Sequence, residues 1–224
     1  MEETKPISTF GLIVIPALIT LGVTILRLVG ELQHWPPLFF STQAGGRLAL
    51  VGISWLPIIF GPYFAMKLAN AGDGPTSMGK AIGFAALSLV VLAAGGVLFG
   101  MTISHPSLLT LLALLLMLGA AFVPGFGWRA LGKTLVAYAF AARIPVVIVM
   151  YFAMHGNGGA GWGTHYDAVA PALAQLPFTR KFIYAGILPQ MTIWIGWTAF
   201  VGSLTGSIFA AIARRGKHTA PASS

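Results

Sequence analysis

Histidine, tyrosine and aspartate gather in the stretch MHGNGGAGWGTHYD, residues 154–167, of a chain that is otherwise mostly apolar. His165 and Asp167 lie two positions apart, and together they could supply a general acid and a general base at ordinary pH. The glycines permit backbone conformations that other residues avoid, which predicts a shaped loop and not a helix. We expect an outer loop that lies on the bilayer and caps the bundle. The alternative is a lid over a cavity, formed by His155, His165, Tyr166 and Asp167.

Arg143 falls near the middle of an apolar segment, where inserting an arginine into a membrane costs about 2.5–3.5 kcal/mol on translocon scales. It must therefore face the protein interior, a wet cavity or a partner. Pro145 removes a backbone donor, so we expect a kink there. Arg143 is predicted to bind an anionic group in a central cavity, with Tyr138 beside it. The alternative is a structural arginine, satisfied by carbonyls and by hydroxyls such as those of Tyr138 or Ser54.

Arg27 and Glu31 are four residues apart on one face of the first apolar segment. This spacing permits an ion pair, although in the less favourable order. Glu31 is the only carboxylate predicted to reach into the membrane, which makes it the best candidate for proton coupling. We expect the pair to guard the outer mouth of the central cavity.

Four histidines fall on the predicted outer side, and imidazole and carboxylate ligands suit zinc and similar ions. The candidates for a metal site are His155, His165 and Asp167. Their spacing matches no diagnostic zinc motif, so no cofactor is expected, and no histidine lies at the mid-span depth that a haem would need. The four outer histidines are His34, His105, His155 and His165.

The composition predicts an integral membrane protein. The chain is 57% hydrophobic and 8% charged, with a mean hydropathy of +0.85, whereas a soluble domain carries roughly a quarter charged residues. The lipid bilayer must therefore cover the surface. The net charge of +8 comes from residues at the ends of apolar runs, as expected for topology signals and lipid headgroup contacts, and not for nucleic acid. Without cysteine, disulfides and thiolate chemistry are excluded.

The fold predicted from these patterns is an all-α bundle of six transmembrane helices, a single domain over residues 1–215. A spanning helix needs about 20 apolar residues. Pro189 is expected to split the last apolar run, so that residues 155–189 form an extracytoplasmic loop with an interfacial segment. Residues 216–224 are predicted to be a disordered cytoplasmic tail. The six expected spans are 10–30, 48–66, 81–101, 108–123, 134–154 and 190–213.

The lysines and arginines favour one orientation of this multi-pass protein in a bacterial inner (plasma) membrane, with both termini cytoplasmic. Eight of them would then lie inside and four outside, which fits the positive-inside rule. The inner set is Lys5, Lys67, Lys80, Arg129, Lys133, Arg214, Arg215 and Lys217, and the outer set is Arg27, Arg47, Arg180 and Lys181.

Two internal patterns concern the packing of the bundle. The segments 57–66 and 145–154 share a leading proline and the ending YFAM. Because these spans would run in opposite directions, a 3+3 inverted repeat is an alternative architecture. Glycines spaced four apart permit close helix approach in lipid. We expect them to pack within the bundle, or alternatively to form the interface of a homo-oligomer or a larger membrane complex. The pairs are Gly96/Gly100 and Gly202/Gly206.

These features favour a carrier or channel-like transporter of a small or anionic solute over an enzyme. Arg143, Glu31, Arg27 and Tyr138 would form the substrate site. Walker, dinucleotide and serine-elbow motifs are absent from the sequence. One alternative is a lipid-binding or lipid-modifying protein that uses the outer loop, with Arg47, Arg180 and Lys181 on a lipid phosphate. The other is a non-catalytic subunit of a membrane complex.

Overall fold

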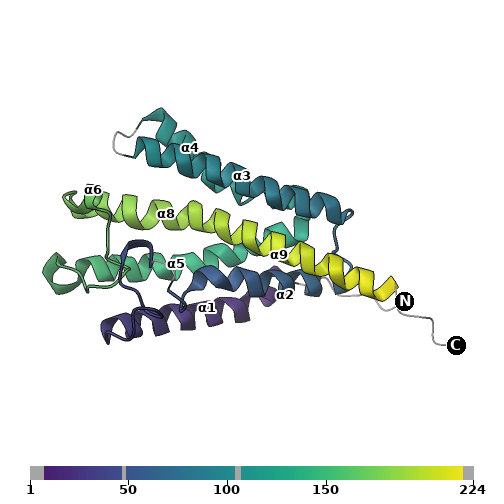
Figure 1. Cartoon of the computed structure of the whole chain (residues 1–224), viewed down its shortest axis with the longest axis horizontal. Coiled ribbons are helices and arrows are strands. Elements are labelled where there is room, and N and C mark those ends of the chain that lie inside the picture. The colour runs from purple at the N-terminus through teal and green to yellow at the C-terminus, as the bar shows by residue number, and fades with distance from the viewer. Residues whose placement is uncertain (1–7, 47–48, 104–106, 219–224) are drawn as a thin grey trace.

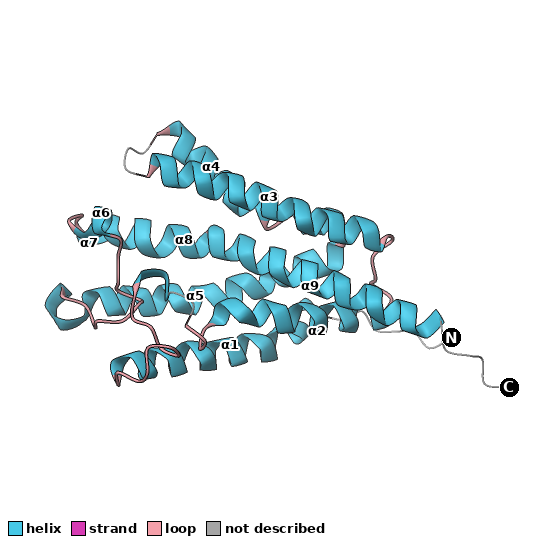
Figure 2. Ribbon diagram, viewed as in Figure 1, coloured by secondary structure: helices cyan, strands magenta, loops and turns pink. Residues whose placement is uncertain are grey.

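In the computed structural model, which describes residues 8–46, 49–103 and 107–218, the regular secondary structure is entirely helical (Figures 1 and 2). The predicted all-α class is thus confirmed for this part of the chain. The principal helices are α1 (Thr9–Leu32), α2 (Leu56–Asn70), α3 (Met78–Thr102), α4 (Leu108–Ala120), α5 (Arg129–Gly159) and α9 (Ile193–His218). The short elements are η1 (Ala44–Gly46), η2 (Ile53–Trp55), η3 (Val123–Phe126), α6 (Pro171–Ala174), α7 (Phe178–Lys181), η4 (Phe182–Ile187) and α8 (Leu188–Met191).

Four helices are long and apolar enough to cross a membrane: α1, α3, α5 and the continuous helical path from Phe178 to Arg214. Each has a mean hydropathy of at least 1.5 over its best window, and apolar side chains cover much of the outer surface. These helices support a helical membrane protein. The other two predicted spans correspond to α2 and α4, which have 15 and 13 residues, so the six-span count stays a prediction.

The helices alternate in direction along the long axis of the molecule. The start of α1 and the end of α9 lie at one end, and α6 lies at the other (Figure 1). The close pairs are α2 with α9, α3 with α4 and with α9, and α5 with α1 and with α9. The ends of α2 and α9 and the starts of α3 and α5 share the first end, which therefore carries Lys67, Lys80, Arg129, Lys133 and Arg214. We call it the basic end.

Two of the predicted boundaries are wrong because local backbone geometry overrides hydropathy. α2 begins at Leu56 and not at residue 48, since Gly52 is extended (φ −175°, ψ 158°) and Pro57 sits in the first helical turn, a position that proline favours. Residue 48 itself lies outside the described part. α9 continues to His218, three residues into the predicted tail, and residues 219–224 are not described.

The expected break at Pro189 is also wrong. The chain is helical from Phe178 onward, through a π-helical turn at residues 182–187 in which the Leu188 N–H donates to the carbonyl of Ile183, five residues back. The only irregular residue before α9 is Thr192 (φ −120°, ψ −79°). Pro189 has no N–H to donate, and the wider turn before it accommodates that loss without ending the helix. The predicted loop 155–189 is therefore irregular only between Gly156 and Pro177, apart from α6.

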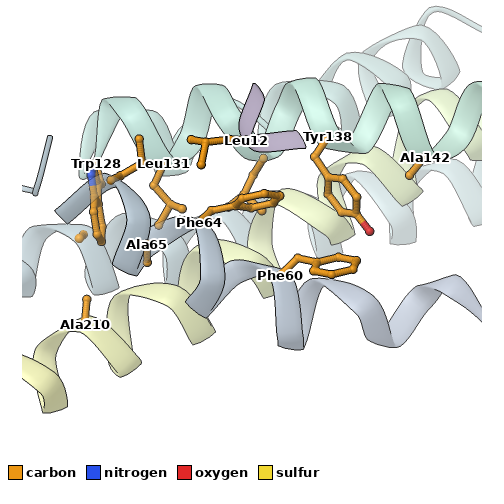
Figure 3. Close-up of a cluster of buried hydrophobic side chains, with 12 residues drawn as sticks. Leu12, Phe60, Phe64, Ala65, Trp128, Leu131, Tyr138, Ala142 and Ala210 are labelled. Carbon is orange, nitrogen blue, oxygen red and sulfur yellow. The ribbon is translucent and has the colours of Figure 1, made fainter. Parts of the chain in front are cut away.

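An aromatic cluster forms the core between α2 and α5 (Figure 3). The Tyr138 ring packs edge-on against the rings of Phe60 and Phe64, with centroid distances of 5.5 and 5.6 Å. Its hydroxyl donates to Thr20 Oγ1 at 2.8 Å, and that hydroxyl in turn donates to the Pro16 carbonyl. Tyr138 therefore joins α1, α2 and α5 as a core residue.

Backbone contact between glycines brings α2 and α9 together. A Cβ atom at Gly61 would lie 2.7 Å from Gly202 Cα, and a Cβ atom at Gly206 would lie 2.6 Å from the Gly61 carbonyl oxygen. Gly202 and Gly206 thus pack inside the bundle, as expected. By contrast, a Cβ at Gly96 or Gly100 would meet no atom within 4 Å, so an oligomer interface there stays a prediction.

The 3+3 inverted repeat is not confirmed. In such a repeat, α2 would correspond to α5 and α3 to α9, so the close pairing of α2 with α9 requires a matching pair of α5 with α3. Among the residues that the structure describes, α3 packs on α4, α9 and η3 and is not a close neighbour of α5. The matching phenylalanines also differ, since Phe64 is 0% exposed and Phe152 is 55% exposed.

Candidate functional site

Glu31, near the end of α1, is the centre of a buried polar network. Its side chain is 1% exposed and accepts from Arg27 Nε at 2.8 Å. It also accepts from both the backbone N–H and the ring Nδ1 of His165, each at 2.8 Å from Oε2. The predicted Arg27–Glu31 ion pair is confirmed, and the structure adds a third member that comes from a loop 134 residues further along the chain.

Arg27 also holds the segment between α1 and α2. Its Nη2 donates to the carbonyl oxygens of Ser41 and Gly46, both at 3.2 Å. Gly46 has a φ of +71°, and a Cβ there would lie 2.5 Å from that same nitrogen, so only glycine fits. Arg27 therefore ties the segment between α1 and α2 to the end of α1.

The remaining residues of the predicted lid divide into two groups. The Tyr166 hydroxyl donates to the Thr24 carbonyl at 3.1 Å, so Tyr166 and His165 both attach the loop to α1. Asp167 instead shapes the loop from within, because it accepts from the backbone N–H groups of Gly163 and Thr164 at 3.0 and 2.8 Å. His155 ends the regular part of α5, where its exposed ring lies 3.8 Å from the Phe178 ring centroid.

The three predicted metal ligands are engaged in these separate contacts. Within residues 8–46, 49–103 and 107–218, no three histidine or acidic side chains come together in a group that could hold a metal ion. His34 follows α1 as an exposed residue with a φ of +54°. His105 and Arg47, which were also expected on the outer side, lie outside the described residues.

The His165 side chain is largely buried, and burial lowers its pKa below the ordinary value of 6.5, while its hydrogen bond to Glu31 opposes that shift. The charged groups that face it are Arg27 and Glu31 of α1 and Asp167 of its own loop. As the pH falls below about 6.5, the unfolded chain takes up the proton before the folded one does. The free energy of unfolding should therefore decrease with acidification through this window.

We expect the melting temperature in detergent to be lower at pH 5.5 than at pH 8. The His165→Asn variant cannot titrate but keeps a donor near Glu31, so its melting temperature should depend less on pH. Equal pH dependence in the wild type and the variant would contradict this assignment.

Arg143 lies in the interior, as predicted, with an exposed fraction of 3%. Its Nη1 donates to Gln190 Oε1 at 3.3 Å, and its guanidinium carbon is 4.7 Å from the centroid of the Trp194 ring, a cation–π arrangement. The buried Nε has no hydrogen-bond partner. Among the described residues, no carboxylate lies within ion-pair distance of Arg143. α5 keeps helical dihedral angles at Pro145, so the expected kink does not interrupt the helix.

The Arg143 guanidinium faces a cavity of about 300 Å³. The cavity lies between α1, α3, α5, the segment that joins α1 to α2, the loop that follows α5 and the helical path from η4 to α9, and Tyr138 does not line it. Arg27 and His165 reach it as well, but both are already bound to Glu31. The polar lining is Arg27, Ser54, Arg143, His165, Tyr166, Tyr184 and Gln190, and the apolar lining includes Ile53, Phe99, Ile103, Val146, Met150, Leu173 and Trp194.

Sequence reasoning missed Gln190 and Trp194, which contact Arg143 directly. One signal was present, since Gln190 is the only amide side chain in the apolar run 182–213. No protein-family model, curated protein or solved structure matches the chain. The function is therefore inferred from the cavity and the residues around it.

Proposed function

We propose that the protein is a membrane carrier or channel-like transporter for a small organic anion, which binds to Arg143. The observation that carries this proposal is the buried guanidinium, whose Nε has no partner, at the wall of a cavity of about 300 Å³. The four long apolar helices support the membrane setting.

An anionic ligand would supply the counter-charge that Arg143 lacks. A charge buried without a counter-charge is strongly unfavourable, and the Gln190 carbonyl and the Trp194 ring compensate Arg143 only in part. A carboxylate or phosphate could accept two N–H groups of one guanidinium in parallel, a geometry that lysine cannot offer. Ligand binding would thus supply the missing acceptor.

The cavity favours a ligand with one negative charge and an apolar body. Glu31 already neutralises the Arg27 side of the cavity, which leaves Arg143 as the uncompensated cation among the described lining residues. The remaining walls are mostly aromatic and aliphatic, including Phe99, Met150 and Trp194. Such walls suit a monocarboxylate with a ring or a branched chain better than a compact polyanion.

The outer loop is the natural gate of this cavity. His165, Tyr166 and residues 168–170 line it, and the loop is attached to α1 through Glu31 and the Thr24 carbonyl. Passage of a solute toward that end requires these contacts to open. Glu31 would then guard the mouth, and protonation of the Glu31–His165 pair would couple opening to protons.

The first test is binding and flux of benzoate, an anion with one charge and an apolar ring. We expect Arg143→Gln to weaken benzoate binding at least tenfold and to abolish uptake of radiolabelled benzoate into proteoliposomes. Arg143→Lys should retain part of both activities. Arg180→Gln is the matched control, because Arg180 is exposed on α7 and does not line the cavity. Wild-type binding and flux in Arg143→Gln would overturn the proposal, provided that the melting temperature shows the variant is folded.

The apolar lining also supports a second candidate, a site for the headgroup of an anionic lipid. The two sources share the same anion chemistry, so native mass spectrometry should distinguish them by the retained mass. A lipid-sized adduct that disappears in Arg143→Gln, with no benzoate uptake in the wild type, would favour lipid binding. A small adduct and benzoate uptake would favour transport.

A further inference from the structure

A second hollow, of about 620 Å³, lies on the surface where η3 meets the start of α5. It is lined by Phe122, Gly125, Phe126, Arg129, Lys133 and Val136, among others, and it shares no residue with the cavity at Arg143. We call it the basic groove. We propose that the basic groove binds one anionic phospholipid, with the headgroup at Arg129 and Lys133 and the acyl chain along the apolar walls.

The groove exists because its floor has no side chains. Gly125 and Gly132 are in backbone contact, since a Cβ at Gly132 would lie 2.7 Å from Gly125 Cα. On one side stand the rings of Phe122 and Phe126, which are 52% and 76% exposed. Val136 and Ala137 of α5 continue the lining away from the charged end. The shape is thus an open apolar channel that starts beside two cations.

The two cations are arranged to share one anion. Arg129 and Lys133 are four residues apart, so they lie on the same face of α5, where like charges repel each other. Both are exposed, and no carboxylate of the described residues lies within ion-pair distance of either one. The positive end of the α5 dipole adds to this field. A bound phosphate would relieve the repulsion.

The position of the groove in a membrane favours a phospholipid over a free anion. α5 is a candidate spanning helix, and Arg129 is its first residue, so Arg129 would lie at the level of the lipid headgroups. The apolar walls run from there toward the hydrocarbon region, in which acyl chains are the solvent. Lys67, Lys80 and Arg214 share the basic end, and such an end faces the anionic leaflet of a membrane under the positive-inside rule.

Gly125 permits a test that fills the groove without disturbing the fold. A Cβ at Gly125 would meet no atom within 4 Å, and its φ is not positive, so Gly125→Leu should place its side chain in the groove. Gly119→Leu in α4 is the matched control, because Gly119 also has open space around it and does not line the groove. The double variant Arg129→Gln/Lys133→Gln removes the charges and keeps the shape.

Each protein would be released from nanodiscs of equal parts phosphatidylglycerol and phosphatidylcholine and analysed by native mass spectrometry. We expect the wild type and Gly119→Leu to retain one phosphatidylglycerol. Gly125→Leu and the double variant should each retain at least ten-fold less phosphatidylglycerol than the wild type.

The proposal would be overturned by full retention in Gly125→Leu, by full retention in the double variant, or by equal retention of phosphatidylcholine in the wild type. A bound peptide or protein that replaces the lipid adduct and is displaced by Gly125→Leu would likewise overturn it. The melting temperature of each variant, measured in parallel, distinguishes loss of lipid from loss of fold.

Discussion

Replacing Gly61 with alanine is expected to destabilise the protein by about 1–3 kcal/mol, the usual cost of overpacking, or to prevent folding altogether. The new Cβ would collide with the Gly202 carbonyl oxygen and lie 2.7 Å from Gly202 Cα. Both are backbone atoms of α9, so no side chain can rotate away. Relief would require α2 and α9 to separate along their whole contact, including the approach of Gly206 to Gly61.

The measurement is the melting temperature in a mild detergent, with Gly96→Ala as the control. Gly96 is also a helical glycine, but a Cβ there meets no atom within 4 Å. Alanine has the higher helix propensity, so the control should melt at the wild-type temperature or slightly above it. Equal melting temperatures for the two variants would show that the glycine contact between α2 and α9 is not close.

Replacing Glu31 with glutamine is expected to cost about 3–5 kcal/mol, because it leaves Arg27 buried without its counter-charge. The same change weakens the acceptor for His165, whose backbone N–H and ring both bind Glu31. In addition to the loss of global stability, the loop that carries His165 should therefore detach from α1. Asp73→Asn, which removes an exposed carboxylate, is the control and should change stability little.

Two readouts separate the electrostatic effect from a general loss of packing. Hydrogen exchange of the His165 amide should become faster in Glu31→Gln, while amides in the middle of α3 stay protected. The double variant Arg27→Gln/Glu31→Gln removes both charges, so it should be more stable than Glu31→Gln alone. If the destabilisation of the double variant instead equals the sum of the destabilisations of the two single variants, Arg27 and Glu31 are not coupled as described.

The features that could be predicted from the sequence are those that depend on one segment at a time. Long apolar runs predicted α1, α3 and α5 because a lipid-covered helix must be apolar throughout. The four-residue spacing predicted the Arg27–Glu31 pair because side chains four residues apart lie next to each other on any α-helix. The high free-energy cost of exposing a charge to lipid predicted that Arg143 lies in the interior, without any knowledge of its neighbours.

The features that could not be predicted depend on contacts between distant segments. Glu31 binds His165, 134 residues away, and nothing local in the glycine-rich stretch marks His165 rather than His155 for this role. Tyr138 was expected to line the cavity with Arg143, but its ring instead packs against Phe60 and Phe64 in the core. Hydropathy also placed the start of α2 too early, because it does not register the extended backbone at Gly52.

The π-helical turn at residues 182–187 sets the rotational phase of the last helical path. One residue turns an α-helix by about 100°, and a π turn takes up one extra residue without ending the helix. Phe178 and Phe182 pack edge-on against Tyr151 of α5. Beyond the turn, Gln190 and Trp194 contact Arg143, which also belongs to α5. With α-helical geometry throughout, one of these faces would rotate away from α5 by about 100°. The extra residue thus brings the residues before the turn and those after it onto the same side of the helix, the side that faces α5.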